Sequence, residues 1–420
     1  MAALSKFNFA YGRKIGSITS MSVAPPPTPS AVLSVRALVM LCVLNHLALT
    51  GSRVAVSLSA LSLGVPAFQV GLMMALFSLL PTLGAVWLGR WVDRGGPRVP
   101  ALAGMVALWA GLLLPACHWA PAMLWLTAAT AGAGYNALLL AVQAQLGRCR
   151  DDAGRARGHS GIGLGTALSG CLGPLVAGQA ITHAGGELAF SLLAACSLMA
   201  WVGAIVTRRG LSDGADDMHL TAHPARLSVR QVLEARGLRR ILLVDLLVGV
   251  AWNANTFLVP VFGAHNGWSA AAVGNLLAAY NAAVLLARAL PAPWRQRLGD
   301  ARIIRFALAC SGLCFLLFPL AHALPMAFAL ECVLGIGLGS ALPSVLALLH
   351  AESPAGRGGE VLGVRLVVLN VSAVVLPIGL GAAVGASLGL ATAMAALGAV
   401  LSCFAAMQRP AQRPAKSTSQ

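Results

Sequence analysis

The chain has 420 residues, of which 58% are hydrophobic and only 10% are charged. A soluble domain carries about 25% charged residues, so this composition excludes a soluble fold of this length. The formal net charge of +16 is compatible with nucleic-acid binding, but the basic residues form short clusters between long apolar runs. That placement excludes a nucleic-acid partner. It predicts a membrane protein with its cations on one side of the bilayer.

Residues 1–32 are polar and proline-rich and lack the apolar core of a secretory signal, so we expect a disordered cytoplasmic tail. Met21 is an alternative start. Long apolar stretches of membrane-spanning length follow, and their unbroken runs predict helices rather than the alternating strands of a barrel. There are twelve of them, at residues 33–60, 68–90, 98–117, 121–146, 158–183, 187–207, 238–262, 268–290, 303–322, 325–349, 360–385 and 388–407.

The connections between these stretches alternate in charge. Both tails and every second connection carry arginine, whereas the remaining connections contain neither lysine nor arginine. By the positive-inside rule, this asymmetry predicts an even number of spans and both termini in the cytoplasm of a bacterial-type inner membrane. One connection is long, at residues 208–237. There Ser228 and Gln231 fit a capping box for a short amphipathic helix, with a plain linker as the alternative.

An internal repeat appears at an offset of about 203 residues. Gly132-Ala-Gly134 recurs as Gly335-Ile-Gly337, and Pro174 recurs as Pro377. The repeat predicts an all-α membrane protein of two parallel, pseudo-symmetric six-helix bundles, at residues 33–207 and 238–407, followed by a cytoplasmic tail at 408–420.

The clearest local motif follows the second span. Gly89 permits close helix packing, Asp93 suits the positive end of a neighbouring helix, and Gly96 supplies a tight turn between Arg94 and Arg98. This stretch resembles the loop motif of the major facilitator superfamily. The resemblance extends from about residue 33 through twelve spans in two halves. It implies transport by alternating access, with this loop latching the cytoplasmic gate and Asp93 meeting the start of span eleven near Gly359.

Span five is similar to the glycine-proline motif of exporters in that superfamily, at Gly170, Gly173, Pro174 and Gly178, although the spacing departs from the family pattern by one residue. Plain helix packing is the alternative. Proton-linked exporters of the family often carry an arginine in span four, where this chain has Ala128, and its repeat partner is Glu331.

Ionisable residues inside predicted spans are candidate functional groups, because burying a charge in the bilayer is costly. Arg53 shares one face of span one with His46 and Thr50, and we expect this polar stripe to line an aqueous cavity. Arg53 then attracts an anionic substrate group, or it pairs structurally. Asp245 and Glu331 are the candidates for proton coupling; Asp245 could instead pair with nearby arginines. Further polar or aromatic candidates for the substrate pathway are Asn136, Gln143, Trp252, Asn253, Asn255 and Asn281.

These observations predict a secondary active transporter for a small organic solute, coupled to protons, with export favoured over uptake. One alternative is proton-linked uptake of an organic anion with Arg53 as its clamp. An alternative from another class is a membrane sensor or assembly factor that transports nothing. The sequence shows no nucleophile–base constellation, metal-ligand cluster or phosphate-binding loop. We therefore expect no enzyme activity, no cofactor and no metal, and a monomer surrounded by lipid.

Overall fold

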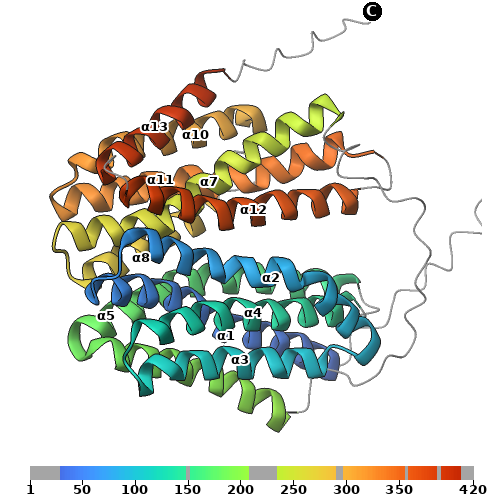
Figure 1. Cartoon of the computed structure of the whole chain (residues 1–420). Coiled ribbons are helices and arrows are strands. Elements are labelled where there is room, and N and C mark those ends of the chain that lie inside the picture. The colour runs from blue at the N-terminus through green and yellow to red at the C-terminus, as the bar shows by residue number, and fades with distance from the viewer. Residues whose placement is uncertain are drawn as a thin grey trace, which may run out of the picture.

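A computed structural model of the chain describes residues 29–147, 152–207, 234–289, 297–354, 358–385 and 389–407. These residues form helices joined by short connections. Figure 1 shows two bundles side by side, the first coloured blue to green and the second yellow to red. The predicted tails and the predicted helix near Ser228 lie outside the described residues, except that the first helix already begins at Pro29.

The first bundle holds five helices, whose bounds lie within a few residues of those predicted except where two predicted spans run together. They are α1 (Pro29–Ser62), α2 (Ala67–Gly95), α3 (Arg98–Cys117), α4 (Pro121–Gly147) and α5 (Asp152–Thr207). The hydrocarbon core is about 30 Å thick, which corresponds to roughly 20 helical residues, so most of these helices extend beyond it.

Helix α5 merges the two predicted spans 158–183 and 187–207 into one element of 56 residues. A straight helix of that length would measure about 84 Å, far more than one crossing needs. Gly185 breaks it, with a φ of 85° that an L side chain rarely adopts. The structure therefore gives eleven candidate membrane helices among the described residues, one of which is long enough for two crossings. The predicted number of twelve depends on dividing α5 at Gly185.

The second bundle holds the helices that follow the long central connection. They are α7 (Arg236–His265), α8 (Ala270–Arg288), α10 (Asp300–Leu317), α11 (Leu324–Glu352), α12 (Gly358–Gly385) and α13 (Leu390–Met407), with a short 3-10 turn, η1 (Phe318–Leu320), after α10. Its helices are as apolar as those of the first bundle, and large hydrophobic side chains face outward from both bundles. Outward apolar surface of this extent is suited to lipid.

The internal repeat is visible in the packing of the two bundles. A methyl group added at Gly132 of α4 would overlap the carbonyl oxygen of Phe77 in α2, and one added at Gly335 of α11 would overlap that of Tyr280 in α8. Both members of the second contact lie 203 positions after their counterparts in the first. Each bundle thus uses a glycine at the same place to bring two backbones together.

The molecule has two chemically different ends. One, here called the neutral end, holds the connections 63–66, 118–120, 266–269 and 321–323, which contain no lysine or arginine. The opposite, basic end carries residues such as Arg90, Arg94 and Arg239.

The halves meet closely toward the neutral end. There Gly71 lies against Pro377 across α2 and α12, and Gly178 lies against Gly274 across α5 and α8. Gln179 also donates a hydrogen bond to Asn275 at 3.1 Å. These backbone contacts close the neutral end of the space between the halves.

Candidate functional site

A cavity of about 260 Å³ lies between the two halves. Four helices line it, α1 and α5 from the first half and α7 and α8 from the second. The lining residues are His46, Thr50, Arg53, Val54, Thr166, Ala167, Gly170, Pro174, Trp252, Thr256, Leu277, Tyr280, Asn281, Val284 and Arg288. Because both halves supply its walls, the shape of the cavity depends on how they are tilted against each other.

The wall from the first half is the polar stripe predicted for span one. His46 Nδ1 lies 2.7 Å from the hydroxyl of Ser169 in α5, which fixes the imidazole at the cavity edge. Thr50 donates to the carbonyl oxygens of His46 and Ser169, both at 3.0 Å. One turn further, the guanidinium of Arg53 lies 5.5 Å from the centre of the Phe77 ring. These contacts orient the stripe toward the cavity.

The wall from the second half is built around an aromatic pair. Trp252 and Tyr280 meet edge to face with ring centres 5.4 Å apart. The guanidinium of Arg288, in the last turn of α8, lies 5.7 Å from the centre of the Trp252 ring. Asn281 lies two turns before Arg288 on the cavity side of α8, and its amide nitrogen donates to Leu277 O at 2.8 Å.

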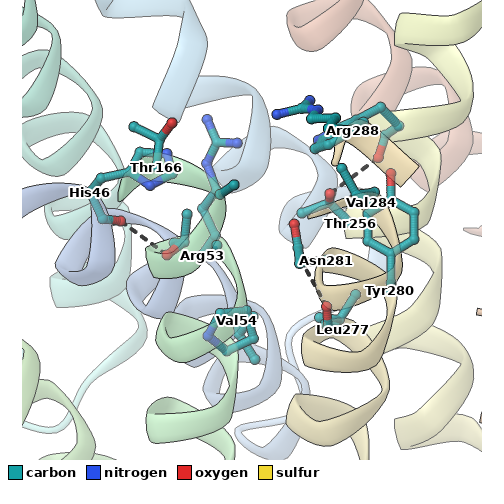
Figure 2. A pocket seen from close by; sticks show the side chains of 15 residues that line it. His46, Arg53, Val54, Thr166, Thr256, Leu277, Tyr280, Asn281, Val284 and Arg288 are labelled. Carbon is teal, nitrogen blue, oxygen red and sulfur yellow. Dashed lines mark hydrogen bonds between the residues drawn. The ribbon is translucent and has the colours of Figure 1, made fainter. Parts of the chain in front are cut away.

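The two arginines dominate the electrostatics of this cavity. Figure 2 shows the guanidinium groups of Arg53 and Arg288 reaching from opposite walls into the space between the halves. The Nε atom of each is buried and has no hydrogen-bond partner within the described part of the chain. No aspartate or glutamate lines the cavity among those residues. The site therefore has a strong positive potential.

A buried carboxylate lies behind the second wall. Glu331 of α11 is fully buried, and one of its oxygens accepts a hydrogen bond from the Asn255 amide at 3.0 Å. Its other oxygen and the hydroxyl of Tyr280 are both buried without hydrogen-bond partners in the described residues. Tyr280 also lines the cavity and interacts electrostatically with Glu331, so it connects the cavity wall to this carboxylate.

Asp245, the other proton-coupling candidate, is already paired. Arg365 of α12 places its Nε 2.8 Å from Asp245 Oδ2 and donates from Nη2 to Oδ1 at 3.2 Å. Both side chains are largely buried, 3% exposed for Asp245 and 12% for Arg365. The partner is thus a residue 120 positions away rather than the neighbouring arginines considered from the sequence. A two-point ion pair of this kind favours the charged carboxylate and a structural role.

The other predicted pathway residues are dispersed. Asn253 joins Arg53 in a much smaller adjoining space of about 20 Å³. Asn255 points into the second bundle toward Glu331. Asn136 lines a separate, mainly apolar groove among α2, α3 and α4, and Gln143 is exposed near the basic end of α4. His46, Thr50, Arg53, Trp252 and Asn281 are the predicted residues that the cavity brings together.

The predicted loop motif lies at the basic end of α2. Asp93 and Arg94 are exposed at the basic end, and a methyl group at Gly89 would meet no atom within 4 Å. The glycines of span five, by contrast, are packed. Gly173 abuts the α1 backbone at Gly51, and Gly178 abuts α8.

Pro174 and Gly170 of the same motif line the cavity. Span five therefore holds α1 on one face and meets the second half on another.

Arg288 is the main residue that sequence reasoning missed. It sits at the end of a predicted span, where an arginine normally marks the membrane interface. The signal available in the sequence was that Arg288 is a charged residue within the predicted span 268–290. Thr166, also in the cavity wall, carries no comparable signal. Within the described residues there is no group of three or more His, Cys, Asp or Glu side chains placed to hold a metal ion.

This architecture defines the class of the protein: a helical membrane protein of two similar halves, with a polar cavity between them that is closed at one end by backbone contacts. Solved transporters share the fold. A POT family transporter in complex with a thioalcohol-conjugated peptide superposes with a TM-score of 0.74 at 13% identity, over 90% of this chain and 98% of that one. A nucleoside transporter, NupG, gives 0.72 at 13% identity, over 90% and 99%.

A bacterial homologue of the human lysosomal transporter Spinster, in an inward-facing and unoccupied conformation, gives a TM-score of 0.72 at 16% identity over 91% and 97% of the two chains. In sequence, the chain is 26% identical over 337 residues to a class G tetracycline resistance protein of Vibrio anguillarum, covering 76% of this chain and 82% of that protein. The family model of the Major Facilitator Superfamily matches residues 38–265 and 241–420. The chain belongs to this superfamily and is a multi-pass membrane transporter.

Proposed function

We propose that the protein is a proton-coupled exporter of a small organic solute and works by alternating access. The cavity between the halves is the substrate site. The basic end faces the cytoplasm of a bacterial-type inner membrane, in keeping with the positive-inside rule. The solute enters from that end, and tilting of the halves then releases it at the neutral end.

The observation that carries this proposal is the unequal closure of the cavity. Backbone contacts at Gly71 and Gly178 join the halves near the neutral end, while Arg288 belongs to the last turn of α8 at the opposite end. The exposed Asp93 fits the same state, because its proposed latch onto α12 forms only when the basic end closes. The closed neutral end supports a conformation in which a solute reaches the site from the basic, cytoplasmic end.

Glu331 is the best candidate for the coupling proton. It is buried and its single described hydrogen bond leaves one oxygen unsatisfied. An ionised carboxylate in such a setting is costly, and binding a proton removes that cost. Tyr280 links this region to the substrate wall, so protonation there can alter the cavity. Asp245, held by Arg365, is the weaker candidate.

Export is favoured by the similarity to a tetracycline resistance protein and by the resemblance of span five to exporters. Uptake is the opposing possibility, and one experiment separates the two. Purified protein in proteoliposomes would be loaded with a panel of labelled metabolites and drugs, and a pH gradient would be imposed in each direction. We expect a solute to move against its concentration gradient, out of the compartment that faces the basic end, when protons flow the opposite way.

Cysteine labelling of positions 118 and 208 would fix the orientation of the inserted protein. A protonophore and the Glu331→Gln variant serve as controls. Flux that does not depend on the pH gradient would contradict proton coupling. Flux equal to that of protein-free vesicles for every solute would instead favour a membrane sensor. Accumulation into the compartment at the basic end would reverse the proposed direction.

A further inference from the structure

We propose that the transported solute is a compact organic dianion, held between Arg53 of the first half and Arg288 of the second. This inference depends on the proposed function of the cavity as a transport site. It narrows the solute from a small organic molecule to one that carries two negative charges, as a dicarboxylate or a phosphate monoester does.

The first step is the absence of internal counter-charges. Two guanidinium groups face one cavity, and neither is paired with a carboxylate among the described residues. Placing a charge within the membrane costs free energy, and such charges are normally paired. The chain does satisfy this rule elsewhere, since Arg365 is paired with Asp245. The two guanidinium groups are therefore placed to bind an anion rather than to form an internal ion pair.

The second step is orientation. Each guanidinium is held against an aromatic ring, Arg53 on Phe77 at 5.5 Å and Arg288 on Trp252 at 5.7 Å. The edge of a planar guanidinium is the part that binds carboxylate or phosphate oxygens in pairs. A ring contact uses none of the N–H donors, and the buried Nε atom of each arginine has no hydrogen-bond partner among the described residues.

The third step is size and composition. A cavity of about 260 Å³ is smaller than the roughly 300–1,000 Å³ of sites for drug-sized ligands, so it fits a small metabolite. The uncharged polar residues Thr166 and Asn281 also line it and can bind hydroxyl or further oxygen groups. A cation would meet two positive charges and no described carboxylate in the wall. These features together select against cationic and bulky solutes.

The fourth step is that each half supplies one arginine. In the empty cavity the two like charges oppose any movement that brings the walls together. A dianion placed between them reverses the sign of that interaction. Bound substrate therefore draws the walls together at the basic end, so a single site both recognises the solute and favours closure around it.

The test is a binding measurement on the purified full-length protein by isothermal titration calorimetry. The probes are succinate and glycerol phosphate as dianions, butyrate as the matched monoanion, succinamide as the neutral analogue, and putrescine as the dication. We expect binding of at least one dianion and about tenfold to a hundredfold weaker binding of butyrate, since each lost charged hydrogen-bonding pair costs roughly that factor. Succinamide and putrescine should not bind.

The matched variants are Arg53→Gln and Arg288→Gln, with Arg36→Gln as the control because Arg36 lies exposed on the same helix as Arg53. Each cavity variant should weaken dianion binding by about tenfold or more and remove the preference over butyrate. Arg53→Lys and Arg288→Lys keep the charge, so they should bind the dianion better than the Gln variants. The control should bind as the native protein does. Circular dichroism and size exclusion verify folding.

The proposal is overturned if butyrate and the dianions bind equally, or if both Gln variants retain native affinity. It is also overturned if a neutral or cationic solute is transported in proteoliposomes while neither dianion binds; the transporter function would then stand. The opposite result, tight dianion binding that depends on both arginines but no flux of any solute, would uphold the site and contradict the proposed function.

Discussion

The two halves of the molecule share one helical plan but hold their charges differently. In the first half, Arg53 faces the cavity and no carboxylate is buried among the described residues. In the second half, Arg288 faces the cavity while Asp245 and Glu331 are both buried behind it. The matching glycine contacts at Gly132 and Gly335 show that the two halves pack in the same way at this position. The two halves therefore differ in their buried charged residues rather than in their helix arrangement.

On the proposed function, the two halves divide the work. Both halves attract the solute, because each offers one guanidinium. The proposed response to protons lies in the second half, which holds the buried Glu331. The position of Glu331 corresponds in the first half to Ala128, a fully buried apolar residue. A repeat of sequence thus permits one half to acquire a titratable group without disturbing the other.

The largest expected effect tests this division at Glu331. The Glu331→Gln variant keeps the shape of the side chain and an acceptor oxygen for Asn255, but it cannot release a proton. We expect complete loss of pH-gradient-driven accumulation in proteoliposomes, with exchange of solute across both faces retained. Glu187→Gln, which alters an exposed carboxylate of the first half, should leave accumulation unchanged. Accumulation by the Glu331→Gln variant at the native level would contradict a role of Glu331 in proton coupling.

The next effect concerns the ion pair between α7 and α12. Replacing Arg365 by Met leaves Asp245 buried without its partner, which should lower the free energy of unfolding by about 3 kcal/mol. Thermal unfolding in detergent would measure the loss. The double variant Asp245→Leu, Arg365→Met removes both charges and should regain most of the stability. An equally large loss in the double variant would show that packing, not charge, is what the pair provides.

A smaller effect tests how far the symmetry extends. Gly132→Ala and Gly335→Ala each force a methyl group against the backbone of a neighbouring helix, and each should destabilise its bundle by about 2 kcal/mol. Thermal unfolding of the two variants should therefore show similar shifts. Gly163→Ala is the control, because a methyl group there meets nothing within 4 Å and replaces a flexible residue within a helix. Unequal shifts of the unfolding midpoint for the two variants would show that the helix packing of the two halves differs at these glycines.

The smallest expected effect has the opposite sign. Arg288→Met removes an unpaired charge from the cavity and keeps contact with Trp252, so it should raise the free energy of unfolding by about 1 kcal/mol. The measurement is the thermal unfolding midpoint in detergent without added solute. Arg36→Met, on an exposed part of α1, should leave the midpoint unchanged. A lowered midpoint for Arg288→Met would mean that this arginine stabilises the empty protein.

The fold was predictable because its cause is local. The lengths of the apolar runs and the arginines in every second connection can be identified from local sequence alone. The helix bounds predicted in this way agree closely with the structure. The main difference is that the predicted spans 158–183 and 187–207 form one helical element, α5. Helix continues on both sides of the non-helical Gly185, and apolar runs alone do not show whether two spans are joined without a loop.

The site was predictable only on α1 and in part on α7 and α8. The stripe of His46, Thr50 and Arg53 has a helical period, so one face could be identified as a unit. Which face of α4 points inward depends on packing against α2 and α3, and Asn136 accordingly faces a different groove. The Asp245–Arg365 pair joins residues 120 positions apart, which no local pattern encodes. The position of Arg288 near the end of a span predicts an interfacial residue, whereas the structure places it in the cavity wall near the Trp252 ring.

The glycine contacts near the neutral end also bear on how the halves part. Bare backbones meet where Gly178 faces Gly274 and where Gly71 faces Pro377, so no side chains interlock across those points. The hydrogen bonds described nearby, from Gln179 to Asn275 and from the Ala271 amide to Thr182, involve groups that water can satisfy instead. If the halves tilt as proposed, backbone contacts of this kind separate without side chains having to disengage at these points, and the same residues meet again when the neutral end closes.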